Sequence, residues 1–172
     1  MPYQAVKPKY EENHLINLEP LDLSKAMATG KARSLKADYP GHIIIGSDQV
    51  GEFNGKLLEK PGTAEKALEQ LMLLNGKTHR LITALCLLDT ASGREIVTTD
   101  IYELTMRTFS REQLKEYLTY DEPFDCAGSY KIESAGLGLF SEINGGDYSG
   151  IIGLPALSLI SGLLEISSEH SK

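Results

Sequence analysis

The segment that most constrains the fold of this chain is residues 42–45, which ends in three consecutive isoleucines and leads directly into Gly46-Ser47-Asp48-Gln49-Val50. An uninterrupted apolar run of this kind is typical of a strand that is buried on both faces of a sheet. An acid directly after such a strand occupies the place where α/β folds carry reactive groups. Asp48 can therefore bind a metal ion or accept a proton from water, and an aspartate that caps a turn is an equally good interpretation.

Helix and strand signals alternate along the rest of the 172 residues. The expected helices are residues 22–37, residues 64–74 after a Thr63 cap, residues 110–120 with a Ser110–Gln113 capping box, and a last helix from Pro155. The expected strands are residues 4–6, 42–45, 80–88, 95–108, 129–133 and 137–143, with a tight hairpin at Asn54-Gly55. This mixture predicts an α/β or α+β fold, one domain over residues 1–172, built around a mixed sheet.

Composition narrows the classes of partner. The formal net charge of −7 argues against a nucleic-acid polymer or an anionic membrane, because both need a basic protein face. The longest uncharged apolar stretch, residues 150–164, is short for a membrane span and contains Pro155. No signal peptide opens the sequence, and two cysteines are too few for a disulfide framework, so a reduced cytoplasmic setting is expected.

Several other segments suit phosphate or base binding, and each has a plainer explanation. Lys60 can neutralise a phosphate, although a solvated lysine is the commoner case. Lys131 and Glu133 share a face if their segment is a strand, and a surface ion pair is the alternative. The glycine-rich residues 144–153 can cradle phosphate before a helix, but an ordinary turn is favoured. Cys126 is interpreted as a structural thiol, because no histidine pairs with it by spacing.

The order of these segments resembles the Maf family of nucleoside triphosphate pyrophosphatases. The resemblance covers roughly residues 3–165 and rests on Gly46-Ser47-Asp48-Gln49-Val50, Glu59-Lys60-Pro61, Asn75-Gly76-Lys77-Thr78-His79, Glu122-Pro123, Cys126-Ala127-Gly128-Ser129-Tyr130 and Gly153-Leu154-Pro155. It implies a two-lobed, ITPase-like fold around an elongated mixed sheet, with the substrate in the cleft. It also implies cleavage between the α- and β-phosphates, with release of pyrophosphate, and a divalent cation such as Mg²⁺ or Mn²⁺.

The resemblance also implies roles for individual residues. Asp48 matches the family's proton acceptor, which would orient water for attack on the α-phosphorus. Lys60 and Lys31 match lysines that face the phosphates, although Glu59 stands where the family usually has glycine before Lys60. Glu11-Glu12 loosely resembles an acidic pair of the family, so Glu12 joins Asp48 as a candidate metal ligand.

Two positions point to one branch of the family. The branch that acts on dTTP and UTP usually has threonine after the aspartate and glutamine in the later segment, whereas Gln49 and Glu133 resemble the 7-methyl-GTP branch. A carboxylate can accept two N–H groups of guanine, and the positive ring charge of a 7-methylated guanine favours it further. The expected substrate is therefore 7-methyl-GTP or a related modified nucleotide, and homodimerisation is left open.

One departure from the family lies at the N-terminus. Family members begin with a strand and helix that carry Ser-x-Ser-x-x-Arg, which grips the phosphates, and residues 1–14 contain no such set. We therefore expect the family's first strand and helix to be missing and the activity of the short chain to be reduced. The alternatives are a catalytically impaired Maf-like protein that binds nucleotides or interacts with other proteins, and a dTTP/UTP pyrophosphatase.

Overall fold

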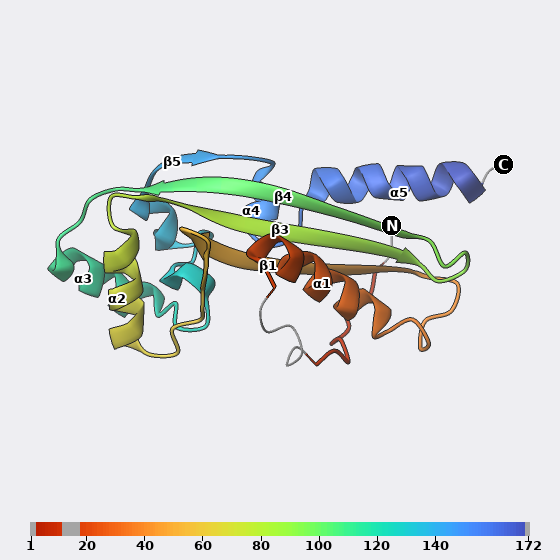
Figure 1. Ribbon diagram of the computed structural model, residues 1–172, viewed down its shortest axis with the longest axis horizontal. Coiled ribbons are helices and arrows are strands. Elements are labelled where there is room, and N and C mark those ends of the chain that lie inside the picture. The colour runs from red at the N-terminus through yellow and green to blue at the C-terminus, as the bar shows by residue number, and fades with distance from the viewer. Residues whose placement is uncertain (1–2, 12–17, 171–172) are drawn as a thin grey trace.

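The computed structural model describes residues 3–11 and 18–170. Within them, five strands form one sheet in the order β2-β1-β3-β4-β5, and each neighbouring pair is antiparallel (Figure 1). The strands are β1 (Ile43–Phe53), β2 (Lys56–Leu58), β3 (Thr78–Asp89), β4 (Glu95–Met106) and β5 (Phe140–Asn144). The helices are α1 (Pro20–Arg33), α2 (Ala64–Leu74), α3 (Arg111–Asp121), α4 (Tyr148–Ile151) and α5 (Ala156–His170). Two short 3₁₀ helices, η1 (Ala127–Ser129) and η2 (Ala135–Leu139), follow α3.

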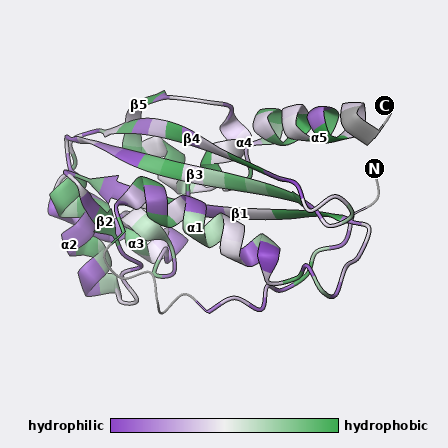
Figure 2. Ribbon diagram, turned by 45° about the vertical axis from the view of Figure 1, so that its right-hand side comes forward, coloured by the Kyte–Doolittle hydropathy of each residue, from purple (hydrophilic) through white to green (hydrophobic). Residues whose placement is uncertain are grey.

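The three long strands β1, β3 and β4 form the backbone of the molecule. Asn54 and Gly55 have φ angles of 53° and 78°, which a tight hairpin requires, and they turn β1 back into β2 as the sequence predicts. Strand β3 lies between β1 and β4 and is buried over most of its length, and Figure 2 shows hydrophobic residues along it. Its apolar side chains therefore support helices on both faces of the sheet.

Two hydrophobic clusters divide the fold into two regions. In the first region, α1 packs on one face of β1 and β3 through small and aliphatic side chains, among them Ala28, Ala32 and Ile44. The second region lies at the other end of the sheet, where α2, α3, η1 and η2 pack around β2 and β5 (Figure 1). Long strands that pass through both clusters hold the two regions in one framework.

The α/β class is confirmed, and several details of the expectation are corrected. The sheet is antiparallel throughout the described residues rather than mixed. Residues 129–133 do not form a strand, because Gly128 and Ser129 have positive φ angles that turn the backbone away from an extended path. Residues 4–6 form no strand, since no neighbouring strand pairs with them in the described sheet.

The observed bounds of several elements also differ from the expected ones. Strand β1 does not stop at Ile45 but continues to Phe53, because β3 offers it pairing partners as far as Glu52. The first helix begins at Pro20, an accepted first-turn position for proline, and ends at Arg33 instead of Ala37. The last of the expected strands begins at Phe140, because η2 occupies the residues before it.

Candidate active site

Helix α1 approaches strand β1 closely enough to place a lysine over it. A Cβ atom at Gly46 would lie 2.3 Å from the carbonyl oxygen of Ala28 and 2.9 Å from the backbone nitrogen of Ala32, so only glycine fits at this position. Ala28 and Ala32 are also fully buried and small. This contact fixes the height of α1 above the sheet beside Asp48, which points to the same face as Gly46 because side chains alternate along a strand.

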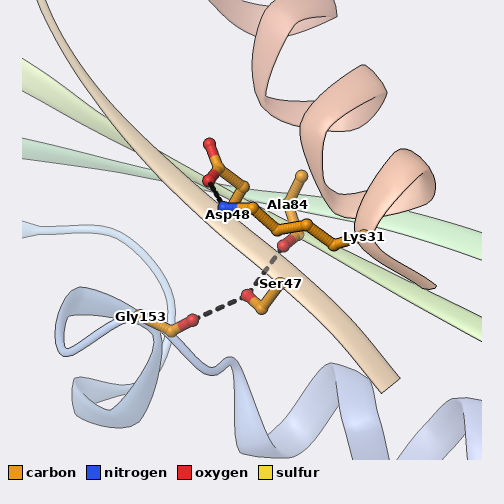
Figure 3. A network of polar contacts seen from close by, with 5 residues as sticks. All are labelled: Lys31, Ser47, Asp48, Ala84 and Gly153. Carbon is orange, nitrogen blue, oxygen red and sulfur yellow. Dashed lines mark hydrogen bonds and ion pairs between the residues drawn. The ribbon is translucent and has the colours of Figure 1, made fainter. Parts of the chain in front are cut away.

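Lys31 and Asp48 form an ion pair at this contact. The distance from Lys31 Nζ to Asp48 Oδ1 is 2.5 Å, and the two side chains are 24% and 10% exposed (Figure 3). The structure therefore brings together two residues that the resemblance assigns to one site. The ammonium group holds the carboxylate in place, and a carboxylate held in this way can orient a water molecule or contact a metal ion.

Ser47 and Gln49 point to the opposite face of β1 and bind the C-terminal part of the chain. The Ser47 hydroxyl donates to the carbonyl oxygen of Gly153 at 2.6 Å (Figure 3). The Gln49 amide nitrogen donates to the carbonyl oxygens of Gly150 and Ile151 at 3.0 and 2.9 Å. Asp48 thus lies within the strand rather than after it, and Gln49 contacts the 150–153 segment.

Lys60 lies in the loop of residues 59–62, called here the phosphate loop, between β2 and α2. Lys60 is exposed. The loop is anchored at its end, where the backbone nitrogen of Gly62 donates to the carbonyl oxygen of Phe124 at 2.8 Å. Lys60 is therefore an exposed residue of an anchored loop in the second region of the fold, which also contains the segment that carries Glu133.

Glu133 lies in a bend of residues 128–133, called here the recognition elbow. Gly128 and Ser129 have φ angles of 82° and 63°. The following Tyr130 is buried, and its hydroxyl lies 2.8 Å from Nε2 of the buried His79. Glu133 itself is exposed. The first residues of the bend are buried and have an unusual backbone conformation, and the carboxylate at its end is exposed. This arrangement suits a segment that holds a recognition group in a fixed position.

The recognition elbow is also tied to the end of α3. The Lys131 ammonium donates to the carbonyl oxygen of Asp121 at 2.8 Å, so Lys131 does not form the ion pair with Glu133 that the spacing suggested. The buried Asp121 carboxylate accepts from the Ser134 hydroxyl at 2.7 Å and from the Gly136 nitrogen at 3.1 Å. Sequence reasoning missed Asp121, because an acid at the end of a helix normally signals only a solvated surface.

The glycine-rich residues 144–153 do not offer a phosphate site at the start of α5. The Asp147 carboxylate accepts from the backbone nitrogens of Ser149 and Leu157 at 2.8 and 3.0 Å. Hydrogen bonds, first from the Ser149 hydroxyl and then from backbone nitrogens, lower the pKa of Asp147. The chain's own carboxylate therefore occupies the helix terminus, in line with the interpretation of this segment as a turn.

Cys126 does not have the properties of a nucleophile. Burial is the main cause that raises the pKa of its thiol to about 11, with a contribution from Asp125. A thiol with a raised pKa is almost entirely protonated near neutral pH and reacts slowly. The interpretation of Cys126 as a structural thiol is thus supported by its surroundings.

Two cavities lie beside these elements rather than on them. One, of about 760 Å³, lies between α1 and β4 and is lined by residues that include Tyr10, Arg33 and Val97. The other, of about 620 Å³, lies between α2 and α3. Asp48, Lys60 and Glu133 line neither of these cavities. The candidate site is therefore identified from the positions of its side chains and not from a cavity.

Within residues 3–11 and 18–170, no group of three or more His, Cys, Asp or Glu side chains is placed to hold a metal ion. Glu12, the second expected metal ligand, lies outside the described residues. No helix in the described part of the chain is both long enough and apolar enough to cross a membrane.

The chain belongs to the Maf-like protein family, whose pattern matches residues 1–166. Among curated relatives, a protein of Pseudomonas savastanoi pv. phaseolicola called 7-methyl-GTP pyrophosphatase is 38% identical over 165 residues, covering 96% of this chain and 86% of the relative. A Bdellovibrio bacteriovorus protein with the same name is 44% identical over 159 residues, covering 91% of this chain and 82% of the relative.

Proposed function

We propose that this chain is a nucleoside triphosphate pyrophosphatase that hydrolyses 7-methyl-GTP to the monophosphate and pyrophosphate. The observation that carries the proposal is the Lys31–Asp48 ion pair, which is part-buried on β1 within a Maf-like fold. The names of the relatives support the substrate. We also propose that residues 1–172 act as one Maf-like domain and that the setting is the cytoplasm.

Asp48 is assigned the role of proton acceptor. A carboxylate that is held on a rigid strand can orient a water molecule toward the α-phosphorus and take its proton as the P–O bond forms. The bond between the α-phosphorus and the bridging oxygen breaks, and pyrophosphate leaves. Lys31 holds the Asp48 carboxylate in place and brings positive charge to a substrate with several negative charges.

Lys60 and Glu133 are assigned to substrate binding. Lys60 is an exposed point charge on an anchored loop, which suits contact with the terminal phosphates. The Glu133 carboxylate suits the base, because it can accept N–H groups of guanine and is attracted to a positively charged 7-methylguanine. Gln49 is assigned an indirect part in specificity, through the 150–153 segment that its amide holds.

A divalent cation fits the available ligands as a companion of the substrate. Mg²⁺ usually binds through one or two carboxylates together with substrate phosphates rather than through a complete protein cage. Asp48 is a carboxylate of this kind, held on β1 by its ion pair with Lys31. When bound, Mg²⁺ or Mn²⁺ would neutralise phosphate charge, and Asp48, with Glu12, is the proposed protein contact.

A pyrophosphate-release assay tests this proposal. The purified chain would be offered 7-methyl-GTP, GTP, UTP and dTTP at equal concentration with Mg²⁺ or Mn²⁺, and again with excess chelator. We expect turnover that is highest on 7-methyl-GTP and absent in chelator. Faster turnover of UTP or dTTP would place the chain in the pyrimidine branch. Tight 7-methyl-GTP binding without turnover would show a nucleotide-binding protein instead of an enzyme.

A further inference from the structure

One glutamine of α2 joins the two segments that carry the proposed substrate contacts. The Gln70 amide nitrogen donates to the carbonyl oxygen of Glu59 at 3.1 Å, directly before Lys60. The Gln70 amide oxygen accepts from the Ser129 hydroxyl at 2.6 Å, in the recognition elbow. The phosphate loop and the recognition elbow are thus held by the two ends of one side chain, although they are about 70 residues apart in the sequence.

The contact to Ser129 is made at a strained and buried position. Ser129 is fully buried and has a φ angle of 63°, a conformation that non-glycine residues adopt only at an energetic cost. Such a conformation persists only where surrounding contacts hold it. Gln70 supplies the hydrogen bond at Ser129 itself, while His79 holds the next residue, Tyr130.

We propose that Gln70 is a positioning residue that sets the distance between the phosphate-binding lysine and the base-recognising carboxylate. This inference rests on the proposed function of Lys60 and Glu133. A nucleoside triphosphate is long enough to need contacts at its phosphates and at its base simultaneously. One side chain that fixes the backbone beside both contacts therefore keeps them in register.

Two single substitutions separate the two ends of Gln70. Gln70→Glu keeps an oxygen acceptor for Ser129 but loses the N–H group that binds the Glu59 carbonyl. Ser129→Ala loses the hydroxyl at the elbow but keeps the Gln70–Glu59 contact. Ser129→Gly is a second elbow variant, because glycine accepts the positive φ angle without strain. Glu69→Gln, at an exposed neighbouring position of the same helix, is the control.

The measurements are kcat and KM for 7-methyl-GTP and for UTP, with thermal unfolding of each variant. Gln70→Glu is expected to raise KM for both nucleotides by a similar factor of about 3–10, the effect of one lost hydrogen bond. Ser129→Ala and Ser129→Gly are expected to lower the preference for 7-methyl-GTP by about 3–10-fold, with KM for UTP little changed. Glu69→Gln should match the wild type.

The outcomes distinguish this inference from the proposed function. If the wild type neither hydrolyses nor binds 7-methyl-GTP, the proposed function is wrong. The proposed role of Gln70 is then wrong as well, because it rests on that function. If the wild type is active and the Gln70 and Ser129 variants lose stability while both KM values and the preference stay unchanged, Gln70 is only structural. If the two kinds of variant change the same parameter in the same way, Gln70 does not position two separate contacts.

Discussion

The region around Asp48 and the region around Glu133 hold their functional side chains by different means. Asp48 lies in the middle of a long strand, and its partner Lys31 projects from a helix that packs on that strand. Glu133 lies in an irregular bend whose side chains form hydrogen bonds with residues of α2, β3 and α3. Regular backbone therefore carries the residues proposed for the chemical step, and irregular backbone carries the carboxylate proposed to recognise the base.

This difference suggests how each region tolerates change. Ladder hydrogen bonds and a close helix contact fix Asp48 regardless of which base is bound, so the chemistry can be common to many nucleotides. The recognition elbow depends on a few side chains, so its shape can be altered without disturbing the sheet. Loops on a rigid scaffold commonly carry specificity in this way.

The largest expected effect comes from the Asp48 region. Asp48→Asn keeps the size of the side chain but removes the charge that accepts a proton, so turnover of every nucleotide should fall by about 10²-fold or more. Pyrophosphate release measures this, with Asp38→Asn as a control, because Asp38 lies in the turn after α1 and pairs with Lys9 rather than with Lys31. Loss of turnover on 7-methyl-GTP alone would move Asp48 from the chemical step to base recognition.

The second prediction concerns the stability of the fold at low pH, through His79, which contacts the recognition elbow at Tyr130. Burial lowers the pKa of His79 from its ordinary 6.5 to about 4 in the folded state. Because the unfolded chain binds the proton first, stability is complete above pH 6.5 and decreases as the pH falls toward 4. The expected loss between pH 7 and 4.5 is about 2–3 kcal/mol. Urea unfolding measures it.

His79→Phe is the matching variant for that measurement. Phenylalanine keeps an aromatic ring against Tyr130 and Phe140, where the ring centroids lie 5.5 and 5.8 Å from that of His79. It cannot be protonated, so its stability should fall less steeply over the same pH range. Equal pH dependence in the two proteins would assign the acid sensitivity to other groups.

The third prediction tests the close contact under α1. Gly46→Ala places a methyl group against the backbone of Ala28 and Ala32, which cannot move without shifting the helix. We expect a loss of about 1–3 kcal/mol in the free energy of unfolding. Gly138→Ala is the control, because a Cβ there meets nothing within 4 Å. If both variants are equally stable, α1 does not pack on Gly46 as closely as described.

The smallest expected effect is a change in substrate preference on substitution of Glu133 in the recognition elbow. Glu133→Gln removes the anionic acceptor for a cationic base, so kcat/KM for 7-methyl-GTP should fall by about tenfold relative to UTP. The exposed Glu142→Gln on β5 provides the control. An equal loss on both nucleotides would show that Glu133 acts on folding or on phosphate binding instead of on the base.

Much of the secondary structure followed from local patterns. The Thr63 cap, the Ser110–Gln113 capping box and the Asn54-Gly55 hairpin all occur where the sequence predicts them. Each depends on contacts between residues a few positions apart, so a short window of sequence contains all the information needed. The expected strand at residues 129–133 failed, because its backbone is set by partners on α2, β3 and α3 that local patterns do not reveal.

The sequence by itself determined the α/β class, the family resemblance and the identities of the candidate residues, because these are properties of residue order and short-range spacing. Tertiary structure decided that Lys31 reaches Asp48, since that contact depends on how closely α1 approaches Gly46. It also decided that Gln49 faces away from Asp48 and that Gln70 joins two distant segments. Contacts between residues far apart in the chain arise only when helices and strands pack, and that packing is a property of the whole fold.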